Sequence, residues 1–237
     1  MFIEEFQKIV KKTSYTFNNE QLMQLERFYD LLIEWNKKIN LTAITEPKDF
    51  IIKHIIDSVS IWDNKKFAET ENIIDIGTGA GFPGIPLKIY KPDKKIVLLD
   101  SLDKRIRFLQ TVTKKLEFKD IFLIHSRAED AAHNFELREN FDLCVSRAVA
   151  KLNVLAEYCL PFVKVGGYFV AMKGASIDNE LKEAERSIDI LGGSNIECNN
   201  IKLPNGDNRN LIYIKKFSNS PNKFPRKAGI PDKKPLI

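Results

Sequence analysis

The sequence predicts an α/β protein in which an α-helical N-terminal cap precedes a doubly wound, mainly parallel sheet that ends in an antiparallel hairpin. Three observations indicate this fold class. Helical apolar spacing fills the first 65 residues, short apolar runs alternate with helical patterns from residue 72 onward, and the last two runs flank a turn sequence. These changes in pattern predict a cap (1–65), an α/β domain (66–217) and a C-terminal tail (218–237).

The cap is predicted to be entirely helical. Its central segment, residues 18–39, has apolar side chains at Leu22, Leu25, Phe28, Tyr29, Leu32, Trp35 and Ile39. Side chains that return every three or four positions form one face of an amphipathic helix. Residues 2–12 and 48–62 follow similar patterns, so we expect three helices before the first strand.

Five short apolar runs predict the parallel strands, at 72–76, 95–99, 120–124, 141–145 and 167–172. The clearest helix between them is Asp103–Leu116, whose apolar face consists of Ile106, Leu109, Val112, Thr113 and Leu116. Strands that alternate with helices in this way form a parallel sheet with helices on both sides.

The end of the sheet is predicted to differ from its beginning. Ile196–Leu203 and Asn210–Phe217 flank the turn sequence Pro-Asn-Gly-Asp, which is typical of a hairpin. A doubly wound sheet that ends in an antiparallel hairpin is the usual build of class I S-adenosylmethionine-dependent methyltransferases, which have a Rossmann-like sheet. It differs from the six-stranded parallel sheet of a dehydrogenase.

The most informative segment is IIDIGTGAGFPG, residues 73–84, where an apolar run leads into Asp75 and a glycine-rich turn. A strand end, flexible backbone and a helix N-terminus in one place can hold a nucleotide-like cofactor, because free N–H groups point outward. The spacing is Gly77-x-Gly79-x-Gly81, whereas the dinucleotide fingerprint expects its third glycine at Phe82. This variant is similar to the loop of S-adenosylmethionine-dependent methyltransferases; a plain structural turn is the alternative.

Further candidate residues follow the other strands, because ligands of open α/β sheets bind at the carboxyl ends of strands. Asp100 lies 23 residues beyond Gly77, close to the spacing of an acid that binds ribose hydroxyls, although it could also cap the next helix. Glu129 could hold an adenine edge or serve as a helix-start acid. Arg147 faces the expected methyl-acceptor space and could bind a carboxylate or phosphate or stack on a base. Lys173 is predicted to be solvated.

Composition excludes several classes of protein. No apolar run approaches the roughly 20 residues of a membrane span, and the start, MFIEEFQKIV, has acids where a signal peptide has basic residues. We therefore expect a cytoplasmic protein that does not associate with a membrane. A monomer is the default expectation for its oligomeric state. No metal site is expected, because the cysteines and histidines are scattered: Cys144, Cys159, Cys198, His54, His125 and His133. The three cysteines are predicted to be buried free thiols.

The positive charge is concentrated at the C-terminus. The chain has a net charge of +5, and residues 215–237 hold seven basic side chains and one acid, so the other 214 residues sum to −1. A basic, proline-containing end beside an α/β domain suggests a polyanionic partner such as RNA, with a solvated surface tail as the alternative. The basic residues are Lys215, Lys216, Lys223, Arg226, Lys227, Lys233 and Lys234.

Several motifs together resemble one family. These are NLTAITEPKDFIIKHIIDS (40–58), DIGTGAGFPG (75–84), SRA-E (126–129), SRAVA (146–150) and FPRKAGIPDKKPL (224–236). In this order they resemble the bacterial 16S ribosomal RNA (guanine-N7)-methyltransferases, also called glucose-inhibited division protein B, from about residue 20 to the C-terminus. One departure is Phe224, where the family commonly has tyrosine, and this would remove a hydroxyl contact to RNA.

The resemblance implies transfer of a methyl group from S-adenosylmethionine to N7 of a guanine in the decoding region of 16S rRNA within the small ribosomal subunit. It implies that Arg147 contacts the cofactor; because methylation at N7 needs no acid, we predict that Arg147 is the catalytic residue, as an organiser of cofactor or RNA. Together with the glycine-rich loop, it implies a cofactor-binding set of Gly77, Gly79, Phe82, Asp100, Ser101, Leu102, Ala128, Glu129 and Arg147.

The chemistry agrees with the absence of other catalytic motifs from the sequence. Guanine N7 has a lone pair and no proton to lose, so in-line attack on a sulfonium methyl needs no general base, and positioning is the main task. Three alternatives remain at this point: a small-molecule methyltransferase, which would not need the basic tail; a non-catalytic cofactor- or RNA-binding module; and an NAD oxidoreductase, which the glycine spacing and the hairpin disfavour.

Overall fold

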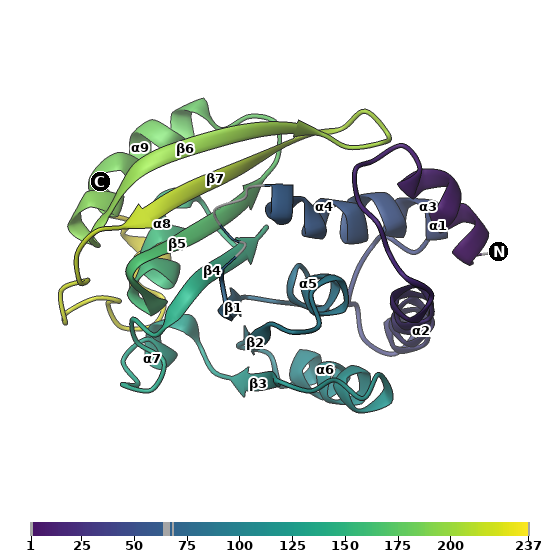
Figure 1. Ribbon diagram of the computed structural model, residues 1–237. Coiled ribbons are helices and arrows are strands. Elements are labelled where there is room, and N and C mark those ends of the chain that lie inside the picture. The colour runs from purple at the N-terminus through teal and green to yellow at the C-terminus, as the bar shows by residue number, and fades with distance from the viewer. Residues whose placement is uncertain (1, 64–66, 68, 237) are drawn as a thin grey trace.

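The computed structural model describes residues 2–63, 67 and 69–236. Its centre is a seven-stranded sheet with the order β3-β2-β1-β4-β5-β7-β6, in which β7 runs antiparallel to β5 and β6 (Figure 1). The strands are β1 (Asn72–Ile76), β2 (Lys95–Asp100), β3 (Ile121–His125), β4 (Phe141–Arg147), β5 (Val163–Lys173), β6 (Gly193–Lys202) and β7 (Asn208–Lys216). The predicted α/β fold class with a terminal antiparallel hairpin is confirmed.

The strand order reverses between β1 and β4. The chain builds outward from β1 to β2 and β3, and then returns to place β4 on the other side of β1, in parallel with it. At such a switch point the loops after the two strands diverge, which opens a crevice at their carboxyl ends. The fold therefore places the segments that follow β1 and β4 on either side of one crevice.

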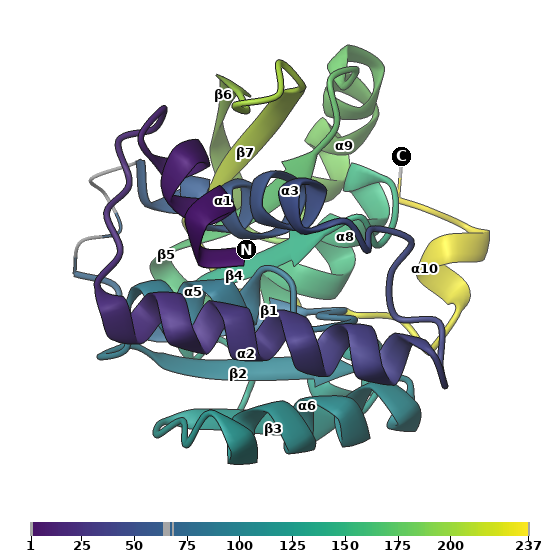
Figure 2. The same ribbon diagram turned by 90° about the vertical axis from the view of Figure 1, so that its right-hand side faces the viewer.

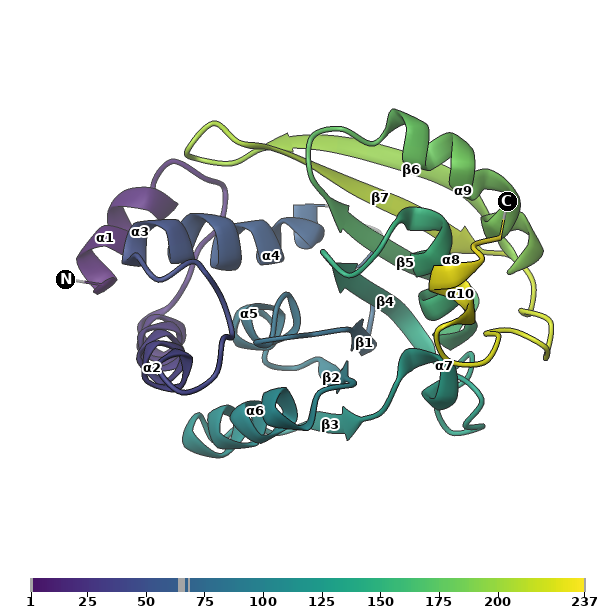
Figure 3. The same cartoon turned by 180° about the vertical axis from the view of Figure 1, so that it is seen from behind.

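Helices cover both faces of the sheet. After β1 they are α5 (Gly84–Tyr90), α6 (Asp103–Lys115), α7 (Ala128–Ala131), α8 (Leu152–Cys159), α9 (Asp178–Ile190) and α10 (Ile230–Lys233), with a 3-10 turn (η4, Leu160–Phe162) after α8. Helices α5 and α6 lie on one face of the sheet and α8 and α9 on the other (Figure 3). Neighbouring residues of one strand point to opposite faces, so Ile73 joins the core beneath α5 and α6, whereas Ile74 joins the core beneath α8 and α9. Both faces are apolar, as parallel sheets require.

The N-terminal helices pack on the α5 and α6 side of the sheet (Figure 2). They are α1 (Phe2–Val10), α2 (Asn19–Asn36) and a continuous helical segment made of α3 (Pro47–Phe50), η1 (Ile51–Ile56), α4 (Asp57–Val59) and η2 (Ser60–Asp63). Their apolar faces share one core with the sheet. The predicted division between cap and α/β domain falls at residues 65 and 66, which lie outside the described residues.

The third N-terminal helix contains an irregularity that its sequence pattern does not reveal. Residues Ile51–Ile56 form a π-helical segment, and five of these six residues are buried. A π-helical segment changes the direction of the side chains that follow it and is frequent at functional sites. Here His54 and Asp57, although polar, are only 8% and 3% exposed.

The C-terminal segment does not extend into solvent over its whole length. The Arg138 guanidinium donates hydrogen bonds to the carbonyl oxygens of Ser220 and Phe224, and Arg226 forms a 2.6 Å ion pair with Glu157. Lys216, counted among the basic residues of this end, is fully buried. A purely solvated tail is therefore wrong as an interpretation of residues 215–226.

Two smaller expectations, for Cys198 and Phe224, are corrected by the structure. Cys198 is exposed, whereas Cys144 and Cys159 are buried as predicted. Phe224 is 5% exposed and packs in the core beside α8, so its ring does not face a partner and position 224 is a core position. In the described part of the chain, no helix is long and apolar enough to cross a membrane.

Candidate active site

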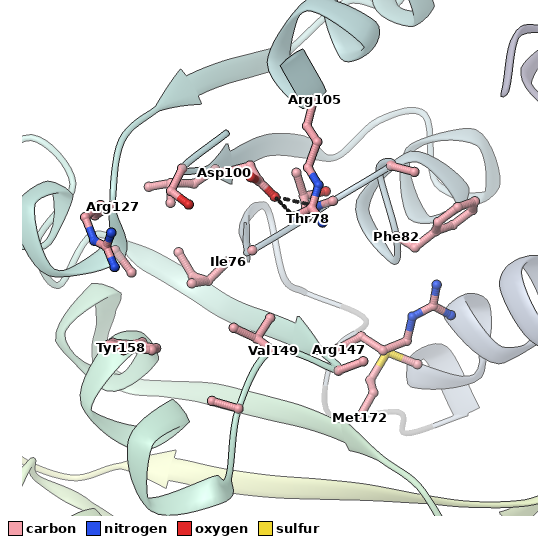
Figure 4. A pocket seen from close by; sticks show the side chains of 18 of the residues that line it. Ile76, Thr78, Phe82, Asp100, Arg105, Arg127, Arg147, Val149, Tyr158 and Met172 are labelled. Atoms are coloured by element: carbon pink, nitrogen blue, oxygen red, sulfur yellow. Dashed lines mark hydrogen bonds and ion pairs between the residues drawn. The ribbon is translucent and has the colours of Figure 1, made fainter. Parts of the chain in front are cut away.

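A pocket of about 1300 Å³ opens at the carboxyl ends of β1, β2, β4 and β5, at the switch point in strand order (Figure 4). Its walls come from segments far apart in the sequence: the loop before α3, the third N-terminal helix, the glycine-rich loop after β1, the ends of β2 and β4, and the C-terminal segment. The sequence predicts a ligand at this position, at the carboxyl ends of the strands.

The glycine-rich loop forms one side of the pocket. Gly77 and Gly79 have φ of +70° and +60°, a left-handed conformation that favours glycine. A Cβ atom at Gly77 would lie 2.6 Å from Cγ2 of Val149, whereas a Cβ atom at Gly79 would meet no atom closer than 4.0 Å. The loop therefore packs tightly against the segment after β4 at Gly77 and leaves open space over its backbone at Gly79.

Asp75, in β1, anchors the glycine-rich loop through side-chain hydrogen bonds. Its Oδ2 accepts hydrogen bonds from the Thr78 hydroxyl at 2.7 Å and the Gly84 amide at 2.8 Å, whereas its buried Oδ1 has no partner among the described residues. Burial raises the pKa of Asp75 to about 7, and these two hydrogen bonds oppose the rise. Protonation removes the cost of burying a negative charge, which is the physical cause of this rise in pKa.

The raised pKa of Asp75 predicts a pH dependence of stability. An aspartate in the unfolded chain titrates near pH 4, so between about pH 4 and pH 7 the folded state binds the proton more tightly, and this contribution to the unfolding free energy decreases as pH rises. Asp75→Asn is expected to flatten that part of the profile in urea unfolding across this range. Asp103→Asn, at an exposed acid, serves as the control, and a slope unchanged by Asp75→Asn would contradict the assignment.

Asp100 fixes the loop from the end of β2. Its carboxylate accepts hydrogen bonds from the amides of Gly79 and Leu102, both at 2.9 Å, and forms a 3.1 Å ion pair with Arg105 (Figure 4). Asp100 is only 2% exposed, so these contacts are shielded from water. The carboxylate thus connects the glycine-rich loop to the start of α6.

Arg147, at the end of β4, connects the sheet to the third N-terminal helix. Its guanidinium forms a 2.9 Å ion pair with Asp57 and donates to the Lys53 carbonyl at 3.1 Å. It also lies 5.1 Å from the centre of the Phe82 ring, toward which it points in Figure 4. Burial raises the pKa of Asp57, and the positive charges of Arg147 and Arg209 oppose this. Arg147 is therefore held in one position rather than free to move.

His54 completes this cluster. Its ring stacks on Phe82 with centroids 4.0 Å apart, and its two nitrogens contact the Arg147 guanidinium at 3.1 Å and the Thr42 hydroxyl at 3.0 Å. Burial, followed by the charge of Arg147, lowers the pKa of His54 to about 3. His54 is consequently a neutral imidazole at physiological pH.

The C-terminal segment forms another wall of the pocket. Glu129 is 4% exposed and accepts a 2.8 Å hydrogen bond from the Gly229 amide, which joins α7 to this segment. Gly229 and Lys233 both line the pocket, and α10 packs beside α8 (Figure 3). The bidentate contact of Arg226 with Glu157 holds the same segment just before Gly229 in the chain.

Eight of the nine predicted cofactor-binding residues line this pocket. They are Gly77, Gly79, Phe82, Asp100, Ser101, Ala128, Glu129 and Arg147. Leu102 does not: its side chain is 42% exposed, and its amide contributes by holding Asp100. The expectation that Lys173 is solvated is wrong, because its ammonium group contacts the Ala150 carbonyl and Glu180 and its side chain is only 11% exposed.

The residues that enter the pocket from outside the sheet were not among the predicted site residues. Thr42, His54 and Asp57 belong to the run 40–58 that carried the family resemblance, and the last two are polar residues within an otherwise apolar helical pattern. Polar residues within an apolar helical pattern could have indicated that this helix contributes side chains to a site. Arg209, at the start of β7, has no comparable signal, because only the pairing of the hairpin with the sheet brings it to within 3.6 Å of Asp57.

Among the residues that the structure describes, no group of three or more His, Cys, Asp or Glu side chains could hold a metal ion. The site consists of a glycine-rich loop, the buried acids Asp75 and Asp100 that brace it, and the cluster around Arg147 at its edge.

A sheet of this topology with a glycine-rich pocket at its switch point defines a class I methyltransferase. The family model for rRNA small subunit methyltransferase G matches residues 21–212. The chain is 51% identical over 227 residues to Ribosomal RNA small subunit methyltransferase G of Desulforamulus reducens, covering 95% of both chains, and 49% identical over 236 residues to that of Clostridium kluyveri, covering 99% of both. The chain belongs to the rRNA small subunit methyltransferase G family, and it is an enzyme.

Solved structures of other methyltransferases share the fold. An O-methyltransferase family protein from Burkholderia thailandensis has a TM-score of 0.53 at 13% identity, covering 82% of this chain and 60% of its own. TYW2 of M. jannaschii, in complex with AdoMet, has a TM-score of 0.50 at 17% identity, covering 66% and 76%. At these identities the likeness concerns the fold, and the prediction of a class I methyltransferase fold is confirmed.

Proposed function

We propose that this protein transfers a methyl group from S-adenosylmethionine to N7 of a guanine in the decoding region of 16S rRNA. The observation that carries the proposal is the single pocket in which the glycine-rich loop and Asp100 face the Arg147 cluster. Such an arrangement can hold a cofactor and a nucleobase together. Membership of the rRNA small subunit methyltransferase G family supports small-subunit rRNA as the source of that base.

The residues of the pocket fit S-adenosylmethionine. The open space above Gly79 allows a ligand to approach the backbone, as a cofactor held by main-chain groups requires. Asp100 would lie on the ribose side and Glu129 on the adenine side, with the glycine-rich loop at the amino-acid end. When bound, the cofactor supplies an electrophilic methyl group on a positively charged sulfur, which nearby carboxylates favour.

The residues around Arg147 would position the acceptor base. Guanine N7 attacks with an in-plane lone pair and loses no proton, so the cluster needs no group with a pKa near 7. Arg147 makes its contacts with Asp57 and His54 through N–H donors, which suits positioning and not proton transfer. Holding two reactants in line can supply up to about 7–11 kcal/mol of barrier reduction.

The exposed lysines of the C-terminal segment are suited to phosphate contacts. Lys227, Lys233 and Lys234 are exposed, whereas Arg226 is committed to Glu157. Deleting the segment would also remove a wall of the pocket, so substitution is the sharper test. Changing the three lysines to glutamine is expected to reduce the slope of log K against log salt for RNA by about 0.7 for each phosphate that is no longer neutralised.

A control for this salt dependence comes from three exposed lysines at the far end of α6 and just beyond it. Lys114, Lys115 and Lys119 are exposed, and none of them lines the pocket. Their change to glutamine removes the same charge. RNA contact by the C-terminal lysines would be refuted if both triple variants changed the salt slope equally, or if neither changed it.

The cellular location and assembly state follow from the same proposal. Small ribosomal subunits are assembled and used in the cytoplasm, where we place the enzyme. A monomer is our default expectation for its oligomeric state. Sedimentation at micromolar concentration would test this.

The decisive experiment uses radiolabelled S-adenosylmethionine and small subunits from cells that lack this gene. Label recovered as 7-methylguanosine in 16S rRNA, identified by mass spectrometry, is the expected result. Label in another nucleoside would overturn the N7 assignment. Cofactor binding without labelled rRNA would instead favour a small-molecule acceptor or a binding module.

A further inference from the structure

Thr42 lies at the edge of the pocket in a rigidly held loop. The Asn36 side chain at the end of α2 accepts hydrogen bonds from the amides of Leu41 and Thr42, at 2.8 and 3.1 Å, and donates to the Thr42 carbonyl at 2.9 Å. Thr42 is half-buried and lines the same pocket as Arg147. Its hydroxyl group is therefore fixed in place relative to the site.

The direction of the hydrogen bonds around Thr42 is determined by Arg147. A guanidinium can only donate, so its 3.1 Å contact with His54 requires an unprotonated Nδ1. The neutral imidazole then carries its proton on Nε2. That nitrogen lies 3.0 Å from the Thr42 Oγ1 and must donate to it.

A second donor reaches the same oxygen. The Ile44 amide donates to Thr42 Oγ1 at 3.0 Å. A hydroxyl oxygen has two lone pairs, so both are now occupied and the oxygen cannot accept a further hydrogen bond. The hydroxyl proton has no acceptor among the described residues. The network thus leaves Thr42 as a donor only, at the wall of the pocket.

We propose that the Thr42 hydroxyl donates a hydrogen bond to the carbonyl oxygen O6 of the guanine that is methylated, and so selects guanine over adenine. O6 and N7 lie on the same edge of guanine, and both accept hydrogen bonds. Adenine presents an amino group where guanine presents O6. That amino group would face an oxygen with no free lone pair. This inference rests on the proposed function.

The test compares Thr42 variants on two substrates. Small subunits carry either guanine or an adenine substitution at the methylated position, and the rate of label transfer is measured together with the affinity for S-adenosylmethionine. Thr42→Val removes the hydroxyl while preserving size, Thr42→Ala removes it without a branched side chain, and Thr42→Ser retains it. Thr45→Val is the control, because Thr45 is exposed and outside the pocket.

Thr42→Val and Thr42→Ala are each expected to lower kcat/KM for the guanine subunit by about 10- to 100-fold, with an unchanged affinity for the cofactor. The ratio of guanine to adenine methylation should fall by a similar factor. Thr42→Ser, which retains the hydroxyl donor, should recover that ratio, and Thr45→Val should keep both values close to those of the wild type. Equal losses on both substrates, or no loss in folded variants, would overturn the role of Thr42. Failure of the wild-type protein to label any guanine would instead refute the proposed function.

Discussion

Replacing Arg147 with alanine is expected to lower methyl transfer to the small subunit about 100-fold, because the cluster that positions the base loses its centre. Arg147 contacts Asp57, His54 and the Lys53 carbonyl at once. Its removal therefore affects the helical segment and the Thr42 network together. Steady-state kinetics with small subunits from cells lacking the gene would measure the loss.

The same substitution affects stability, and this must be separated from activity. Breaking a buried ion pair on one side costs up to about 3–5 kcal/mol. Asp57 is 3% exposed and, among the described residues, would retain only its ion pair with Arg209 at 3.6 Å. The double variant Arg147→Gln with Asp57→Asn leaves no uncompensated charge. This double variant should have a urea unfolding midpoint close to that of the wild type, and its rate of methyl transfer should still be low. Near-normal turnover by a folded variant that lacks Arg147 would refute the positioning role.

Asp100→Asn is expected to weaken binding of S-adenosylmethionine by about 10- to 100-fold, measured by isothermal titration calorimetry. The carboxylate accepts from two amides and pairs with Arg105. An asparagine side chain has one oxygen for these donors and directs its NH2 group at the rest. The glycine-rich loop would lose its connection to β2 even though the side chain keeps its size.

The matched control for Asp100 is Asp103, three residues further along. Asp103 has a side chain that is 51% exposed and pairs with Arg107 at the surface of α6. Asp103→Asn makes the same chemical change without touching the pocket, so cofactor affinity should stay within about twofold of the wild type, as surface ion pairs contribute little. Equal affinities for the two variants would contradict the bracing role of Asp100.

Local patterns predicted the elements of the fold well. The strand β1 occupies the predicted residues 72–76, and α6 ends one residue before its predicted limit. Both follow from apolar periodicity, which depends on neighbours a few residues apart. The π-helical turn at Ile51–Ile56 was not predictable in this way, because its hydrogen-bonding pattern leaves no distinct signature in the spacing of apolar residues.

The residues of the candidate site were also only partly predictable from the sequence. Gly77, Asp100, Glu129 and Arg147 were identifiable because each lies at or just after the end of a strand, and parallel strands end at one edge of a sheet. The partners of these residues were not. Asp57 reaches Arg147 across 90 positions of the chain, and no local pattern pairs them.

The sequence by itself determined the fold class, the glycine-rich loop and the family, because these depend on short-range periodicity and on motifs in a fixed order. Only the tertiary structure decided that Glu129 accepts a hydrogen bond from Gly229. Only it decided that the Arg147–His54 contact determines the direction of the hydrogen bond between His54 and Thr42. Hydrogen bonds between distant segments exist only once packing has fixed both partners. The N-terminal helices and the C-terminal segment pack against the sheet, and this packing forms the walls of the pocket at the carboxyl ends of the strands.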